Sequence, residues 1–320
     1  MCKCETLIKA IDAYIAKADD NLSDALDEAG FVKPKVTVKK MGALEDRLTS
    51  ELEKETKYFK RKAKEAVNLE AFAKDFPSLI DDDKTDGKLS ELFVKDFKEN
   101  IPELAAGYIK QVDPKLTVKT ITARTLTWAE SWSEKLGRLM KLDSHKEVET
   151  LLTDTLKEGK GIADFVRLLS DKDIRSERYR ARAVALTETL RAHSVAQQEA
   201  LTQNPAVESK EWVHTGGYRN SPRENHVAMN GIIVSKDEPF TLEGADGTTY
   251  YPMYPRDPVL PPGESVNCHC IHRGIANENI LGLSLEERKR LQEEAIKADD
   301  EAWEEELDAK NKARAGIEQA

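Results

Sequence analysis

The 320-residue sequence has few aromatic residues, no long apolar run and no excess of basic charge. Aromatic residues make up 6% of the chain and charged residues 34%, which favours charged helices around a modest core over a dense β-sandwich. No run of about 18 apolar residues occurs, which argues against a transmembrane helix. The first residues lack the pattern of a secretory signal, so we expect synthesis in a cytoplasm and no membrane contact.

The formal net charge of -10 disfavours a general nucleic-acid-binding surface. A weak DNA contact would need a local basic patch. The segment 172–191 is the basic stretch that could supply one, through Lys172, Arg175, Arg178, Arg180, Arg182 and Arg191.

Cysteine is scarce and occurs only as two C-x-C pairs, Cys2/Cys4 and Cys268/Cys270. A single intervening residue makes a disulfide within either pair strained. Metal ligation or free thiols are therefore expected in a reducing compartment.

Apolar residues recur at three- and four-residue steps through much of the chain, which predicts helices. Gly30 is expected to end the first helix, and a capping box at Ser284 and Glu287 to begin a very acidic last one. The segment 81–87 is similar to a calcium loop, but Phe93 stands where a bidentate Glu is needed, so a solvated turn is expected. The predicted helices before residue 204 span 7–26, 44–67, 89–111, 118–142, 145–157, 161–170 and 174–202.

Residues 210–275 differ in composition from the helical segments before them. They are rich in Gly, Pro, His and aromatic residues and contain short extended runs at 211–214 and 231–234. The expected fold class is mainly α, with a small α+β, loop-rich C-terminal module, a helical N-terminal region and an acidic helical tail. We divide the chain into a helical assembly region at 1–158, a central domain at 159–278 and an acidic C-terminal helix at 279–320.

Several motifs in this part of the chain follow one another in a fixed order. They are RARAVALTET at 180–189, Trp212, RENHVAMNG at 223–231, Phe240, P-x-D-P at 255–258 and NCHC at 267–270. Together they resemble the phage Mu F-like minor head proteins, also called phage head morphogenesis proteins, and identify 159–278 as that family's domain. Two positions depart from the family: Leu186 and His269 stand where members often have Arg.

The resemblance implies a structural minor capsid protein of a tailed bacteriophage, located in the virion at the head or portal vertex. It would assemble in the host bacterial cytoplasm, contact the portal protein and the major capsid or scaffolding protein, and assist head assembly, DNA packaging or ejection. No catalytic residue is assigned. The residues expected to organise the domain are Glu188, Trp212, Arg223, Gly231 and Asn267.

Glu188 has two interpretations. It could form an ordinary surface ion pair with Arg191, or be held against the unit that contains Trp212 and His226.

His226, Cys268 and Cys270 have the thiol and imidazole groups that zinc prefers, which predicts a structural zinc site. We take His272 as the fourth ligand, with His214 and His269 as alternatives. A C-x-C pair can reach one ion only if its backbone bends sharply. Without a metal, the cysteines would be small buried hydrophobic residues and His226 would fix the Pro-rich loop by hydrogen bonds.

The alternative function is a metal-dependent nuclease or other DNA-processing factor. Cys with His can form a thiol nucleophile, and His226, Asn230 and His272 are weakly similar to the residues of HNH nucleases. No clear ββα frame accompanies them, so the structural interpretation leads. The acidic tail is expected to be a solvated face or to dock on a basic surface of a portal or capsid subunit.

Overall fold

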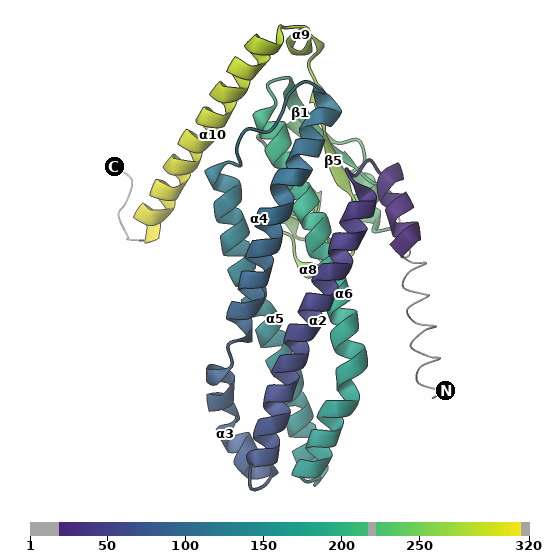
Figure 1. Cartoon of the computed structure of the whole chain (residues 1–320), viewed down its shortest axis with the longest axis vertical. Helices are drawn as coiled ribbons and strands as arrows, with labels where there is room; N and C mark the ends of the chain where they lie inside the picture. Colours follow the sequence, from purple (N-terminus) through teal and green to yellow (C-terminus); the bar gives the residue numbers. More distant parts are fainter. Residues whose placement is uncertain (1–18, 217–221, 315–320) are drawn as a thin grey trace. The chain divides into compact units, whose positions relative to one another are not determined.

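The computed structural model describes residues 19–216 and 222–314, and their side chains except those of 171–177. These residues are mainly helical, with a few short strands, which confirms the predicted fold class (Figure 1). The predicted helix at 7–26 lies largely outside the described residues, and its described part is helical from 19 to 28. Gly30 ends it with a φ of 85°, and Phe31 N–H donates to Leu26 O at 2.9 Å.

Four long helices carry most of the chain before the sheet, namely α2 (Pro34–Glu65), α4 (Thr85–Val112), α5 (Ala123–Lys157) and α6 (Ile162–Gln203). The shorter α3 (Leu69–Asp82) precedes α4. Two pairs of predicted helices are each a single helix in the structure. The helices predicted at 118–142 and 145–157 form α5, and those predicted at 161–170 and 174–202 form α6. The polar residues at those interruptions include no Gly or Pro, so they thin the apolar pattern without breaking the backbone.

The described residues fall into two compact units, each made of separated segments. Unit 1 takes its residues from Met1–Met41, Glu99–Leu126 and Thr187–Ala320, and unit 2 from Gly42–Lys98 and Thr127–Leu186. Each long helix contributes residues to both units. The division of the chain into three consecutive regions stays a prediction.

Unit 2 is helical. Its core is built from aromatic and aliphatic residues at helical spacing, namely Phe59, Ala63, Leu69, Phe72, Phe76, Leu151, Leu152, Phe165 and Leu169.

Unit 1 contains an antiparallel sheet of order β2-β1-β5, formed by β1 (Val207–Val213), β2 (Ile233–Ser235) and β5 (Ile271–Ala276). The two extended runs predicted from the sequence correspond to β1 and β2. A second pair joins β3 (Leu242–Glu243) to β4 (Thr249–Tyr250). The core beside these strands contains Trp212, Met229, Phe240, Leu242, Leu260, Cys268 and Cys270.

Helix α9 (Glu278–Leu281) is followed by the acidic helix α10 (Leu285–Arg314), which begins where the capping box predicts, since Glu287 N–H donates to Ser284 Oγ at 3.2 Å. One side of α10 packs on the segment 113–124 of unit 1. There the buried Arg288 pairs with Asp113 at 2.7 Å, and the Arg124 guanidinium lies 4.9 Å from the Trp303 ring centre. The acidic helix is therefore not solvated on every side.

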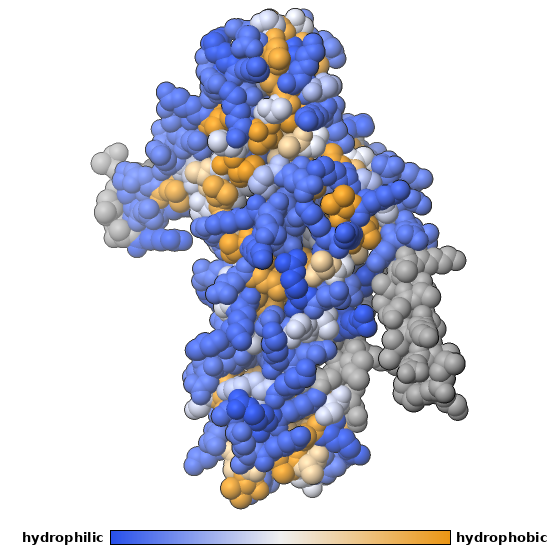
Figure 2. Space-filling view, in the orientation of Figure 1, coloured by the Kyte–Doolittle hydropathy of each residue, from blue (hydrophilic) through white to orange (hydrophobic). Residues whose placement is uncertain are grey.

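The face of the molecule shown in Figure 2 is strongly polar. Hydrophilic residues dominate the face shown in Figure 2, with smaller hydrophobic areas between them. None of the helices in the described ranges has the length and apolar character needed to cross a membrane.

Candidate metal centre

His226 lies on α7 (Glu224–Ala228), a short helix whose preceding residue, Arg223, donates from its guanidinium to Val266 O at 2.7 Å. The His226 side chain is buried, and its ring meets the edge of Trp212 at 5.9 Å between centroids. Trp212 is itself fully buried on β1. The sheet core therefore fixes the position of the imidazole.

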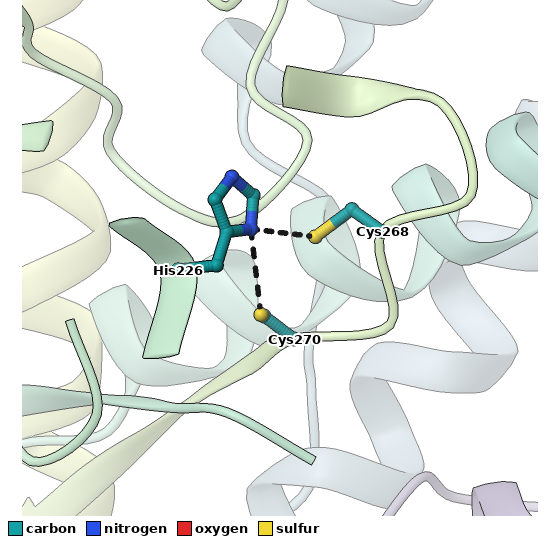
Figure 3. A group of neighbouring side chains, drawn as sticks. All are labelled: His226, Cys268 and Cys270. Carbon is teal, nitrogen blue, oxygen red and sulfur yellow. Dashed lines mark hydrogen bonds between the residues drawn. The ribbon is translucent and has the colours of Figure 1, made fainter. Parts of the chain in front are cut away.

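Cys268 and Cys270 lie between α8 (Pro262–Ser265) and β5, in the segment that approaches His226 (Figure 3). His226 Nδ1 is 3.5 Å from Cys268 Sγ and 3.6 Å from Cys270 Sγ. All three side chains are buried, and their ligand atoms lie within 4.8 Å of one another. The structure thus brings together three of the four ligands predicted from the sequence.

A buried arginine that the sequence did not single out bends the C-x-C backbone. Arg256 Nη1 donates to Cys268 O and to Cys270 O, each at 2.7 Å, and Nη2 donates to Ser194 Oγ at 2.6 Å. The two carbonyls converge on one nitrogen atom, which is the sharp bend that a C-x-C pair needs to direct both sulfurs to one point. Arg256 is fully buried and has a φ of 67°, a backbone conformation that is rare for non-glycine residues.

Glu264, on α8, was also missed, and it fixes the tautomer of His226. Its Oε2 lies 2.9 Å from His226 Nε2, while Oε1 accepts from Ala245 N–H at 2.9 Å. Burial raises the pKa of Glu264, but the hydrogen bonds from Ala245, Asn225 and His226 outweigh it and lower the pKa overall. The Glu264 carboxylate is placed to accept a hydrogen bond from His226 Nε2, which leaves Nδ1 as the ring nitrogen that faces the two sulfurs.

The pKa values of the two thiols shift in opposite directions. A hydrogen bond from Cys270 lowers the pKa of Cys268 well below its usual value, and His226 and Arg256 lower it further. The same hydrogen bond, together with burial, raises the pKa of Cys270 well above its usual value. Two cysteine sulfurs beside an imidazole nitrogen form a donor set that suits a soft or borderline cation.

The geometry favours His214 over His272 as a fourth ligand. His214 Nδ1 is 3.5 Å from Cys270 Sγ, and its backbone N–H donates to Asn230 Oδ1 at 2.8 Å. Burial lowers the pKa of His214, which keeps the imidazole neutral as a ligand must be.

Neither His272 nor His214 belongs to the group of three ligand atoms found among the described residues, so the preference for His214 rests on its distance to Cys270 Sγ. The His272 ring is fully buried and stacks on Tyr254, with centroids 6.0 Å apart. His269, the other alternative, offers its carbonyl oxygen to Thr215 Oγ1 at 2.9 Å.

The residues expected to organise the domain surround this centre. Glu188 pairs with Arg191 at 2.9 Å, and both side chains are 4% exposed, so the pair is buried and not at the surface. Arg191 also donates to Arg256 O, which links Glu188 to the loop that holds the cysteines. Glu188 is therefore connected to the cysteine segment indirectly, through Arg191 and Arg256.

Gly231 and Asn267 occupy the turns. Gly231 has a φ of 84° and donates its N–H to Trp212 O at 2.9 Å, as the Asn-Gly turn signal predicted. Asn267 has a φ of 55° immediately before Cys268, and its N–H lies 3.4 Å from Thr187 Oγ1. Asn tolerates this left-handed conformation better than most residues.

A long helix carrying Thr187 and Glu188, a small sheet and a buried His-Cys-Cys group lie largely within one stretch of the chain that matches a known family. Residues 146–273 match the family model described as phage Mu protein F like protein, and the chain belongs to that family. It is 34% identical over 305 residues to the uncharacterized protein YqbB of Bacillus subtilis (strain 168), an alignment that covers 92% of this chain and 99% of the relative. No solved structure matches the chain. Family membership indicates a bacteriophage head morphogenesis protein and a component of the virion.

Proposed function

We propose that the chain is a non-catalytic minor head protein that attaches at the portal vertex and assists head assembly, DNA packaging or ejection. The observation that carries this proposal is the burial of the three side chains that form the candidate metal centre. His226, Cys268 and Cys270 are at most 3% exposed, and Glu264 and Arg256 hold them in place. Catalytic zinc sites keep a position open to substrate, whereas structural sites are closed.

The centre is proposed to hold a structural zinc ion. With the usual zinc–sulfur and zinc–nitrogen bond lengths, tetrahedral ligands are separated by about 3.5 Å. The nitrogen–sulfur distances of 3.5 and 3.6 Å at His226 fit that separation. Zinc would bind Cys268, Cys270, His226 and His214, and would cross-link α7, β1 and the loop before β5.

Helix α10 supplies the proposed contact with the portal protein, or with the major capsid or scaffolding protein. Its inner side is fixed on unit 1 by Arg288 and Arg124, so its outer side projects outward as a rigid acidic surface. The exposed glutamates on that side include Glu286, Glu294, Glu304 and Glu305. A surface of this kind fits a basic partner surface.

A pull-down of the full chain by purified portal protein tests this contact. Charge reversal by Glu304→Lys/Glu305→Lys should weaken capture roughly tenfold or more and make it less sensitive to salt. The matched control reverses two exposed acids on another helix, Glu147→Lys/Glu149→Lys. Equal capture of both variants and the wild type would rule out α10 as the contact.

A weak DNA contact finds less support in the basic stretch 172–191. Arg182 pairs with Glu45 at 2.7 Å, Arg180 donates to Ser144 Oγ at 2.8 Å, and Arg191 is buried against Glu188. Three of its arginines are thus engaged within the protein. We expect DNA affinity to be weak and to fall steeply as salt is added.

The nuclease alternative is tested with the same preparation. Plasmid and linear DNA incubated with the chain and Mg²⁺, Mn²⁺ or Zn²⁺ should remain intact. Divalent-ion-dependent cleavage that disappears in His226→Ala would overturn the structural proposal in favour of a nuclease.

A further inference from the structure

Unit 2 contains a second buried group of metal-ligand residue types, remote in sequence from the family motifs. Glu55 lies on α2, Asp83 directly follows α3, and His145 lies on α5. Their side chains are 4, 7 and 5% exposed, and one ligand atom from each lies within 4.8 Å of the others. Asp83 belongs to the segment 81–87, which was expected to be a solvated turn, yet this one acid is buried.

One imidazole nitrogen faces both carboxylates. His145 Nε2 is 3.0 Å from Asp83 Oδ2 and 3.4 Å from Glu55 Oε1. Nitrogen and oxygen ligands of a tetrahedral zinc ion are separated by about 3.4 Å. The three atoms therefore have the spacing of ligands around one ion.

Glu55 supplies an independent sign that a ligand is missing. Its Oε1 is buried and accepts no hydrogen bond from the described residues, although it points at His145. A buried carboxyl oxygen without a hydrogen-bond partner is an unfavourable arrangement that a bound cation relieves.

Asp83 is oriented for the same role. Its Oδ1 accepts from Thr85 N–H at 3.1 Å and from Thr85 Oγ1 at 2.7 Å, which leaves Oδ2 directed at His145. The nearby cations are engaged elsewhere, since Lys141 donates to the backbone oxygen of Asp83 and Arg180 to Ser144 Oγ. Supporting hydrogen bonds of this kind hold metal-binding carboxylates in position.

We propose that Glu55, Asp83 and His145 bind a divalent transition-metal ion that ties α2 and α5 to the turn between α3 and α4. An imidazole with two carboxylates suits zinc, manganese or iron(II). Calcium is a poor fit, because it takes six to eight oxygen ligands and this group offers two carboxylates. The ion would staple unit 2 in the way that the thiolate centre staples the sheet of unit 1.

Zinc counting on the full chain tests the proposal. The protein is stripped with chelator, saturated with zinc, freed of unbound metal and analysed for zinc per chain. The wild type should hold two zinc ions, and Glu55→Gln one, because a neutral amide weakens binding on the order of 100-fold. The control Glu53→Gln, an exposed residue on the same helix, should hold two.

Cobalt distinguishes the two sites and separates this proposal from that of the thiolate centre. Sulfur-to-cobalt charge-transfer absorption reports only the cysteine site, so it should be unchanged in Glu55→Gln while the total cobalt falls by one. Glutamine is nearly isosteric with glutamate, so the metal-free melting temperature of Glu55→Gln should match that of the wild type. A wild-type count equal to the thiolate-bound metal alone would overturn the proposal, as would an undiminished count in Glu55→Gln; the first result needs no variant to fold.

Discussion

The two buried groups of ligand-type residues differ in how completely their surroundings hold them. In unit 1, Glu264 fixes the tautomer of His226 and Arg256 fixes both cysteine carbonyls. In unit 2, among the described residues, Glu55 Oε1 and His145 Nδ1 have no hydrogen-bond partner. Burial and spacing are alike, so the difference is one of pre-organisation: hydrogen bonds hold both the ring and the cysteine loop of the first group, whereas in the second they orient Asp83 and leave atoms of Glu55 and His145 without partners.

The largest expected effect follows from removing both sulfurs of the first group. Cys268→Ser/Cys270→Ser should lose one zinc per chain and at least about 5 kcal/mol of stability, because the binding energy of a structural zinc is folding energy. Elemental analysis and thermal melts measure both quantities. The matched control is Cys2→Ser/Cys4→Ser, which removes the other C-x-C pair and should change neither. If the wild type holds no thiolate-bound metal, the cysteines return to ordinary packing.

The next effect concerns the arginine that bends the C-x-C backbone. Arg256→Met should cost about 3–5 kcal/mol, because it leaves the carbonyls of Cys268 and Cys270 and the hydroxyl of Ser194 without their buried donor. Denaturant unfolding measures the loss. Arg273→Met, at a residue whose ion pair with Glu211 is exposed, should cost less than about 1 kcal/mol. Similar losses in the two variants would mean that Arg256 is not the support described above.

Sequence patterns predicted the helices and the first group for different reasons. Apolar periodicity identified the helices but divided α5 and α6, because it cannot distinguish a polar interruption from a break in the backbone. His226 and the two cysteines were predicted because zinc prefers cysteine and histidine ligands, and the sequence contains few residues of either type. The fourth ligand stays a prediction: His214 Nδ1 lies close to Cys270 Sγ, and sequence order alone does not reveal which ring lies nearest to the sulfurs.

Residue types and local patterns did not predict Arg256 and Glu264, which hold the first group, or the three residues of the second group. Arg256 and Glu264 lie in a Pro-rich loop where arginine and glutamate are normally exposed, and their burial depends on tertiary contacts alone. Asp83 and His145 are 62 residues apart, and only the packing of three helical segments brings them together with Glu55. A local sequence pattern carries no signal for such a group.

A smaller effect tests whether pre-organisation of the first group matters for binding. Glu264→Gln keeps the shape of the side chain but replaces the carboxylate that accepts the His226 Nε2 proton, so zinc affinity should fall about 10–100-fold. Competition with a chromophoric chelator measures the change. Glu243→Gln, at an exposed acid on β3, should bind as the wild type does. An unchanged affinity in Glu264→Gln would show that the sulfurs and the ring hold their positions without it.

His193 extends the comparison to a buried histidine with both nitrogens satisfied. Its Nε2 lies 2.8 Å from Thr37 Oγ1 and its Nδ1 2.7 Å from Tyr108 Oη, so it has no lone pair to offer a metal. Burial, followed by the charges of Arg256 and Lys40, lowers its pKa from 6.5 to about 3. Such a group is structural, and its protonation opposes folding.

The pH dependence of stability measures this effect. Below pH 6.5 the unfolded chain takes up a proton that folded His193 does not, so its contribution to stability is lost as the pH falls toward 3. At about 1.4 kcal/mol per pH unit, the loss between pH 7 and pH 5 is about 2 kcal/mol. His193→Gln cannot titrate, so its free energy of unfolding should fall by that much less over the same interval. Parallel pH profiles for the two proteins would mean that the folded chain protonates His193 readily, and that full hydrogen bonding does not keep a buried histidine neutral here.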